Sequence, residues 1–152
     1  MKVLLTGSTG QVGQEIINSI PPNIKIINPL RKDLDLSDFK SCEKIVITER
    51  PDWVINCGAF TSVESAEQNI ELAKKINSYA PQAFTRALNK INGNLLQLSS
   101  DFVFDGSKNI PYNENDYKNP ICHYGYTKSL GENLIQKTIE NLENATILRT
   151  SW

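Results

Sequence analysis

The sequence predicts an α/β fold in which helices cover both faces of a parallel β-sheet, a doubly wound arrangement of three α/β/α layers. Five short apolar runs alternate along the chain with longer segments of helical periodicity. Parallel strands need such segments between them, because a tight turn cannot connect two parallel strands. The composition agrees with one domain that buries a full core, since 39% of the 152 residues are hydrophobic and 22% are charged.

The predicted strands are Val3–Leu5, Ile24–Ile27, Trp53–Ile55, Leu95–Leu98 and Thr146–Leu148. The predicted helices are Gln11–Ser19, Ser37–Glu49, Ile70–Asn89 and Tyr124–Leu142, and Ser37 is expected to cap the second of them. Right-handed crossovers favour the strand order 3-2-1-4-5, with a ligand crevice at the carboxyl ends of the first and fourth strands. The segment Asp105–His123 has no periodicity and is predicted to be a long functional loop.

A glycine turn follows the first predicted strand directly, with the sequence TGSTGQVG over residues 6–13. Glycines let backbone N–H groups approach a pyrophosphate closely, and the N-terminus of the next helix attracts its negative charge. The turn therefore predicts a dinucleotide site of the Rossmann type, with a merely flexible glycine turn as the alternative.

A charged cluster lies about 20 residues beyond the turn, where the ribose of a bound dinucleotide is expected. Arg31 and Lys32 would receive a 2′-phosphate and favour NADPH, whereas an acidic side chain there would favour NADH. Asp35 and Leu36 are predicted to contact the adenine. The sequence leaves open both the choice of cofactor and the alternative of a solvated charge cluster.

Tyr124 and Lys128 have the spacing Tyr-x-x-x-Lys, which places both side chains on one face of a helix. A cation near the phenol is expected to lower the pKa of Tyr124, so that the tyrosine can give a proton to a carbonyl oxygen. Ser100, at the end of the fourth predicted strand, would donate a hydrogen bond to the same carbonyl.

Several classes of partner are disfavoured by the composition. A net charge of −1 gives no footprint for nucleic acid or a polybasic membrane patch, and no apolar run approaches the roughly 20 residues that span a bilayer. We therefore expect a cytoplasmic protein with a small-molecule partner. The three cysteines lack C-x-x-C spacing and are expected to be buried thiols, while His123, the only histidine, predicts no metal cluster. Glu64, Glu67 and Glu71 are expected to form a solvated helix face.

Further motifs extend along nearly the whole chain. They are Leu4–Gly13, Pro51–Asn56, Ala59–Thr61 with Val63, Ala66–Glu67, Ser99–Gly106, Ile110–Tyr112, Asn119–Pro120, Tyr124–Gly125 with Lys128, Gly131–Glu132 and Leu148–Trp152. With these motifs the chain resembles the extended short-chain dehydrogenase/reductases and, among them, the dTDP-4-dehydrorhamnose reductase family. Two small departures keep the chemistry: Ser100 replaces a usual Thr, and Cys57 and Gly58 replace usual alanines.

The resemblance implies reduction of the C4 ketone of a dTDP-linked sugar with NADPH or NADH, by a catalytic set of Ser100, Tyr124 and Lys128. The cofactor-binding residues it implies, together with those of the glycine turn and the charged cluster, are Gly7, Gly10, Gln11, Val12, Gly13, Arg31, Asp35, Leu36, Cys57, Gly58, Ala59, Thr61, Asn77 and Ser99. Asp101, Phe102 and Trp152 are implied to face the nucleotide sugar.

The resemblance also implies a smaller C-terminal domain that supplies most substrate contacts and is associated with Mg²⁺-dependent homodimers. We expect residues 1–152 to be the NAD(P)-binding domain, truncated after the fifth strand and lacking that second domain. Two other functions remain open: an epimerase or dehydratase of the same superfamily that retains its NAD, and a non-catalytic dinucleotide-binding module.

Overall fold

Five parallel strands form a single sheet in the computed structural model, which describes residues 1–151. The strands are β1 (Lys2–Thr6), β2 (Lys25–Ile27), β3 (Trp53–Asn56), β4 (Asn94–Ser100) and β5 (Ala145–Thr150). All four neighbouring pairs are parallel. The predicted α/β class and the five strands are therefore confirmed.

The strand order is β2-β1-β3-β4-β5, so the predicted order 3-2-1-4-5 is wrong. After β2 the chain crosses directly to the other side of β1, where β3 pairs with it from Val3↔Trp53 to Thr6↔Asn56. Among the described residues no strand pairs with the outer side of β2, and residues 28–38 after it form turns. The reversal of strand order lies between β1 and β3, so a ligand crevice is expected at their carboxyl ends and not, as the sequence predicted, at those of the first and fourth strands.

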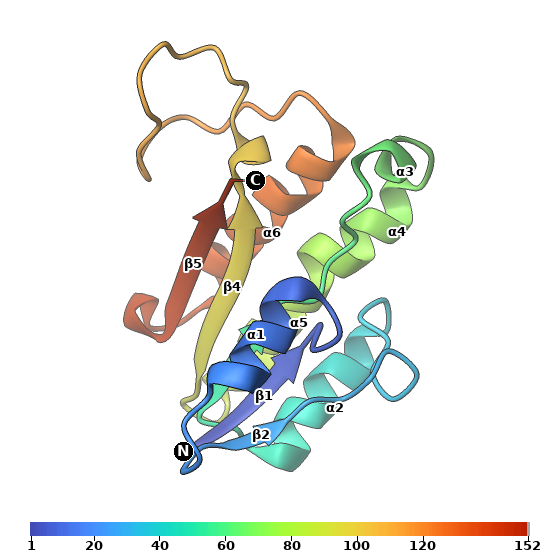
Figure 1. Cartoon of the computed structure of the whole chain (residues 1–152), viewed down its shortest axis with the longest axis vertical. Coiled ribbons are helices and arrows are strands. Elements are labelled where there is room, and N and C mark those ends of the chain that lie inside the picture. The colour runs from blue at the N-terminus through green and yellow to red at the C-terminus, as the bar shows by residue number, and fades with distance from the viewer. Residues whose placement is uncertain (152) are drawn as a thin grey trace.

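The helices lie on both faces of this sheet (Figure 1). They are α1 (Gln11–Ser19), α2 (Phe39–Glu49), α3 (Val63–Gln68), α4 (Ile70–Lys74), α5 (Ala80–Asn89) and α6 (His123–Thr138), with a π-helical turn η1 (Lys75–Tyr79) and 3₁₀ turns η2 (Asp101–Val103) and η3 (Leu142–Asn144). Helix α1 covers one face, while α2, α5 and α6 lie on the other. None of the described helices is both long and apolar enough to cross a membrane.

Three helix predictions need correction. Asp38, and not Ser37, caps α2, because its carboxylate accepts hydrogen bonds from the N–H groups of Lys40 and Ser41. The segment predicted as one helix, 70–89, is divided by the π-helical turn η1, and α3 precedes it without having been predicted. The last predicted helix ends at Thr138 instead of Leu142.

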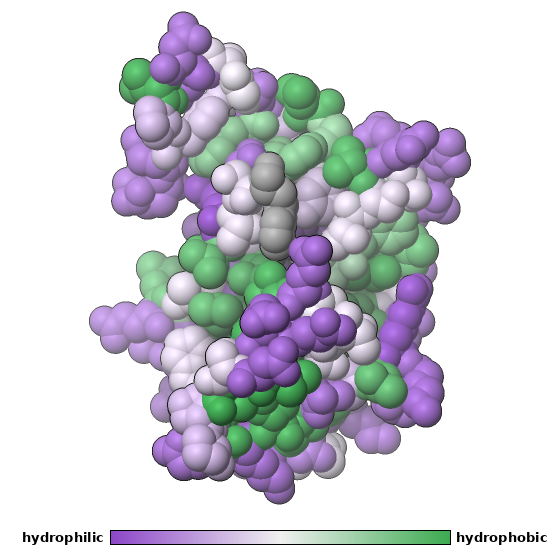
Figure 2. All heavy atoms as spheres, viewed as in Figure 1, coloured by the Kyte–Doolittle hydropathy of each residue, from purple (hydrophilic) through white to green (hydrophobic). Residues whose placement is uncertain are grey.

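The hydrophobic core lies between the sheet and α2, α5 and α6. Leu4, Val54 and Leu95 of three adjacent strands pack there against Phe84 of α5 and Val46 of α2, all of them fully buried. Helix α1 buries only Gly13 among its residues. On the outer surface, hydrophobic side chains occur in separate areas divided by hydrophilic ones (Figure 2). This core therefore holds β1, β3 and β4 in place, and the candidate site lies at the carboxyl ends of these strands.

Candidate cofactor and active site

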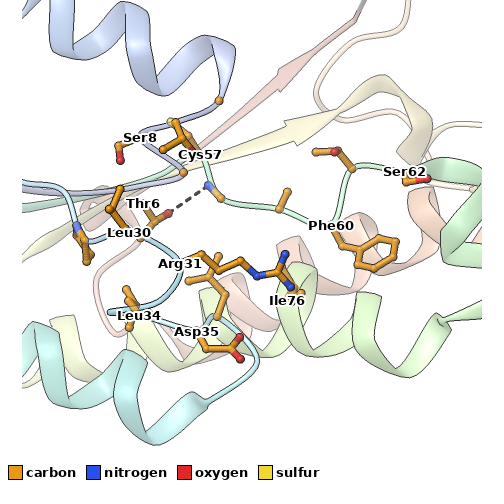
Figure 3. A pocket seen from close by; sticks show the side chains of 18 residues that line it. Thr6, Ser8, Leu30, Arg31, Leu34, Asp35, Cys57, Phe60, Ser62 and Ile76 are labelled. Carbon is orange, nitrogen blue, oxygen red and sulfur yellow. Dashed lines mark hydrogen bonds between the residues drawn. The ribbon is translucent and has the colours of Figure 1, made fainter.

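A pocket of about 450 Å³ opens at the carboxyl ends of β1, β2 and β3 (Figure 3). Three segments line it: the glycine turn after β1, the charged segment after β2, and the residues that follow β3. Of the predicted cofactor-binding residues, those in its wall are Gly7, Gly10, Arg31, Asp35, Leu36, Cys57, Gly58, Ala59 and Thr61. Segments distant in the sequence therefore meet in one cavity, at the point where the strand order reverses.

The glycine turn is shaped by close approaches of backbone to backbone. Gly7 has a φ of +67°, and a Cβ there would lie 2.5 Å from the Gly58 nitrogen. A Cβ on Gly13 would lie 2.2 Å from the Gly7 carbonyl oxygen, so α1 can begin close to the turn only with glycine at that position. Gly10 precedes α1 without a side-chain cap. The first N–H groups of the helix are thus suited to an anion at the pocket's edge.

The charged wall of the pocket comes from the segment after β2. Arg31 extends across the pocket and Asp35 lies below it, as Figure 3 shows. Hydrogen bonds from Ser37, with the nearby Arg31 guanidinium adding a smaller effect, hold the pKa of Asp35 below its usual range. Arg31 therefore offers a fixed positive charge and Asp35 a carboxylate at the same end of the cavity.

The segment after β3 is held in place by Asn77, which lies in the turn η1. The Asn77 amide accepts a hydrogen bond from the Phe60 nitrogen at 2.8 Å and donates to the Phe60 oxygen at 3.1 Å and to Thr127 Oγ1 at 3.0 Å. It does not line the pocket. Its polar atoms bond to protein groups, and its predicted contact with the cofactor stays a prediction. Its neighbour Ile76 reaches the cavity.

Ser100, Tyr124 and Lys128 lie together at the end of β4 and the start of α6. The Ser100 hydroxyl donates to Asp101 Oδ1 at 3.0 Å and accepts from the Phe102 nitrogen at 3.2 Å, and it lies near enough to the Tyr124 phenol to lower the phenol's pKa. Lys128 is 5% exposed and donates from Nζ to the Leu98 carbonyl oxygen at 2.6 Å. The predicted catalytic set is therefore assembled in one place.

The prediction that Lys128 lowers the pKa of Tyr124 is wrong. Burial raises the pKa of the phenol, and the hydrogen bond from Ser100 offsets only part of that rise. The Lys128 ammonium is directed to the Leu98 carbonyl instead, and burial lowers its pKa to about 8 although Glu132 and Cys57 act to raise it. Tyr124 is thus a protonated phenol at neutral pH, which suits a proton donor.

The turn η2 packs directly on the start of α6. A Cβ on Gly125 would lie 2.1 Å from the Phe102 carbonyl oxygen, so glycine at this position permits the contact. The Phe102 ring meets the Tyr124 ring edge to face, with centroids 5.6 Å apart. Phe102 remains 42% exposed and Asp101 is exposed as well, so both face outward beside Tyr124.

A buried ion cluster behind the site was missed at the sequence level. Glu132 of α6 is 1% exposed and binds Arg149 of β5 through two hydrogen bonds of 2.9 and 2.7 Å. Lys118 lies 3.1 Å from the same carboxylate, and Ser99 donates to it at 2.6 Å. Burial raises the pKa of Glu132, but these partners outweigh it and the net shift is downward. The Ser99 hydroxyl, predicted to bind the cofactor, is engaged here instead.

Glu67 is more than part of a solvated helix face. Its carboxylate accepts a hydrogen bond of 2.7 Å from the His123 nitrogen, the first residue of α6, and lies 3.1 Å from His123 Nδ1. His123 is thus a helix residue and not a loop residue. Glu67 and His123 connect α3, which follows the pocket wall, to the helix that carries Tyr124.

The remaining predicted residues divide as follows. Gln11, Val12 and Gly13 form the first turn of α1 and lie outside the pocket wall. Trp152 lies outside the described residues. Across residues 1–151 no group of three His, Cys, Asp or Glu side chains is arranged to hold a metal ion.

The parallel sheet, the glycine turn and the pocket at the reversal of strand order define a Rossmann-like domain. The chain belongs to the family described as the RmlD substrate binding domain, which matches residues 1–152. It is similar to dTDP-4-dehydrorhamnose reductase of Salmonella typhimurium, with 36% identity over 156 residues that cover 100% of this chain and 51% of the relative. The spore coat polysaccharide biosynthesis protein SpsK of Bacillus subtilis is 34% identical and is covered to 53%. The chain spans about half the length of these relatives.

Solved structures give the same result. A dTDP-4-dehydrorhamnose reductase from Clostridium acetobutylicum superposes with a TM-score of 0.94 at 36% identity, covering 100% of this chain and 54% of that one. A second, from Bacillus anthracis in complex with NADP, has a TM-score of 0.93 at 30% identity, with 99% and 53% covered. UDP-glucose 4-epimerase from Thermus thermophilus shares the fold alone, with a TM-score of 0.81 at 18% identity.

Proposed function

We propose that this chain binds NADPH or NADH in the pocket after β1, β2 and β3, as the cofactor domain of a dTDP-4-dehydrorhamnose reductase. The observation that carries the proposal is the meeting of an uncapped helix start, a glycine turn and a cavity of about 450 Å³ near the half-buried Tyr124 and the buried Lys128. The family and the similarity to a reductase solved with NADP support it. The pyrophosphate would lie at the start of α1, near Gly10.

The chemistry proposed is reduction of the C4 ketone of dTDP-4-dehydro-L-rhamnose, for which the bound nicotinamide supplies a hydride. Tyr124 gives the proton to the ketone oxygen, since its phenol is protonated at neutral pH. Ser100 donates a hydrogen bond to that oxygen, and Lys128 holds the nicotinamide ribose from its anchored position at Leu98. Asp101 and Phe102 border the nucleotide sugar, together with Trp152.

Calorimetric titration of the chain with NADPH and with NADH tests the first part of the proposal. Saturable binding is expected, and Gly10→Glu should abolish it by placing a side chain and a negative charge at the pyrophosphate position. An unchanged affinity in Gly10→Glu would refute the cofactor assignment. Asn18→Glu is a matched control, because it adds a negative charge to the same helix at an exposed residue outside the pocket wall.

Turnover tests the second part, in a protein of the relatives' full length that begins with this sequence. With dTDP-4-dehydro-L-rhamnose, oxidation of NADPH is expected, and Tyr124→Phe should remove it while cofactor affinity stays nearly unchanged. Turnover near the wild-type rate in Tyr124→Phe would contradict the proton-donor role. NAD that stays bound through purification, without net oxidation of NADPH, would favour an epimerase or dehydratase. Binding without any turnover would favour a dinucleotide-binding module.

A further inference from the structure

Three buried polar side chains form a row across the middle of the sheet, next to the pocket. Thr6, Asn56 and Gln97 are register partners on β1, β3 and β4, and their exposed fractions are 3%, 1% and 4%. Neighbouring strands in a buried parallel sheet usually pair apolar side chains at such positions. Each polar group here needs a hydrogen-bond partner, because burying it unpaired is costly.

The hydrogen bonds in this row all run in one direction. The Gly58 nitrogen donates to Thr6 Oγ1 at 3.2 Å, the dashed line in Figure 3. The Thr6 hydroxyl then donates its only proton to Asn56 Oδ1. The Asn56 amide nitrogen donates to Gln97 Oε1 at 2.7 Å, and Gln97 Nε2 donates to the Leu98 carbonyl oxygen at 2.7 Å.

The last acceptor of the row is also the anchor of Lys128. The Leu98 oxygen accepts from Lys128 Nζ at 2.6 Å, so one carbonyl receives both the Gln97 amide and the buried ammonium. A carbonyl oxygen has two lone pairs, and Gln97 occupies one of them. A continuous path of hydrogen bonds therefore connects Gly58, in the wall of the pocket, with Lys128 on α6.

We propose that Asn56 and Gln97 are positioning residues that fix the Leu98 carbonyl to which the Lys128 ammonium donates, and that they couple this ammonium to the cofactor groove at Gly58. The inference rests on the proposed function, since it gives Lys128 a role beside the cofactor. Because the Gly58 nitrogen donates to Thr6 Oγ1, the Thr6 hydroxyl proton points to Asn56. This sets the orientation of the Asn56 amide, which in turn sets that of the Gln97 amide. A reversed Gln97 amide would place two oxygens 2.7 Å apart at Leu98, so the row has one stable direction.

This arrangement directs the donor end of each amide toward Lys128. Aligned hydrogen bonds in a buried environment polarise one another, so a change at one end of the row alters the field at the other. A shift of the Gly58 nitrogen on cofactor binding would thus reach the ammonium through side chains alone. Glu132 and Cys57 are the other groups that act on the pKa of Lys128, and removing the Thr6 hydroxyl changes neither of these side chains.

The test is an NMR titration of the 152-residue chain without any ligand. The ¹³Cε resonance of Lys128, assigned by its loss in Lys128→Arg, reports the protonation of the ammonium as the pH is varied. Thr6→Val keeps the side-chain shape and removes the hydroxyl. We expect it to move the Lys128 midpoint by about half a pH unit or more, a shift within the range that neighbouring dipoles cause. In a Gln97→Met background the same substitution should cause no further change.

Thr85→Val is the matched control, because Thr85 is fully buried and its hydroxyl bonds only to the Pro81 oxygen within α5. It should leave the Lys128 midpoint unchanged. If Thr6→Val fails to fold, Asn56→Ser is used in its place, because it interrupts the row at the next hydrogen bond. An unchanged midpoint in Thr6→Val, or an equal shift in the Gln97→Met background, would overturn the coupling.

Failure of this inference is separable from failure of the proposed function. A parallel titration with NADPH measures cofactor binding in the same wild-type sample. Absence of NADPH binding would contradict the proposed function. The coupling between Thr6 and Lys128 is decided separately, by the pH titration without ligand. NADPH binding together with no coupling between Thr6 and Lys128 would leave the proposed function intact and overturn the positioning role.

Discussion

Substituting Gly13 by Ala tests how closely α1 must approach the glycine turn. The added Cβ would lie 2.2 Å from the Gly7 oxygen, 2.7 Å from the Ser8 Cα and 2.9 Å from the Gly7 carbonyl carbon, all of them backbone atoms. Since carbon–oxygen contacts are normally no shorter than about 3.3 Å, α1 has to retreat by about 1 Å. Such overpacking costs up to about 3 kcal/mol, and the better helix propensity of Ala returns about 1 kcal/mol.

We therefore expect Gly13→Ala to lower the free energy of unfolding by about 2 kcal/mol, and Tm by about 4–8 °C for a chain of this length. Gly10→Ala is the control, because its Cβ would meet the Gly7 oxygen at an ordinary 3.4 Å. In Gly10→Ala two effects of about 0.5–1 kcal/mol each nearly cancel: Ala is a poorer N-cap than Gly, which destabilises the folded state, and Ala restricts the unfolded chain, which favours folding. Urea unfolding followed by circular dichroism measures both. Equal stability of the two variants would refute the reasoning.

Three further outcomes are expected. Arg31→Ala should weaken NADPH about tenfold or more in calorimetry and NADH much less, because only NADPH carries a 2′-phosphate for the guanidinium; equal losses would count against this reading. Glu132→Gln should cost about 3 kcal/mol in urea unfolding by leaving Arg149 unpaired. The Glu132 pKa lies below its ordinary 4.5, so its stabilisation is complete above that pH and is lost as the pH falls through the folded-state pKa, a loss that Glu132→Gln should not show. In a protein of the relatives' full length, Glu67→Ala should lower kcat and leave KM nearly unchanged, because the contact between α3 and α6 is lost. Glu67→Gln should restore part of kcat, since its amide oxygen still accepts from the His123 backbone nitrogen. An unchanged kcat in Glu67→Ala would contradict a link between α3 and α6.

The sequence was informative where local patterns decide the structure. The bounds Gln11–Ser19 of α1 were predicted correctly, since a glycine turn precedes the helix and prolines follow it. The strands were placed within a few residues because each is an apolar run between breakers. The strand order was not predictable in this way. An apolar run shows that a strand exists, but its neighbour in the sheet depends on where the chain crosses, here from β2 past β1 to β3, and the run itself carries no signal for that.

For the candidate site, the sequence identified residue types better than their partners. The glycine turn, the charged cluster and the grouping of Tyr124 and Lys128 with Ser100 were expected from the motifs, whereas the part of the pocket wall at residues 57–61 was implied by the family resemblance. Asn77 and Ser99 also lie near the site, but their side chains bond to Phe60, Thr127 and Glu132 instead of lining the cavity. Those partners are 17 to 50 residues away along the chain. Spacing in the sequence therefore carries no signal for them.

The π-helical turn η1 divides the continuous helical segment from Ile70 to Asn89 into two parts that pack against different elements. Before it, α4 packs against α6, and after it, α5 fills the core with Phe84 and Leu88. A regular helix advances about 100° per residue, so deleting one residue within η1 would rotate one half against the other by about that angle. Asn77 and the core face of α5 would then no longer be correct together. The extra residue of the π-helical turn sets the rotation between the two parts, so that Asn77 meets Phe60 and Thr127 while the core face of α5 meets the sheet.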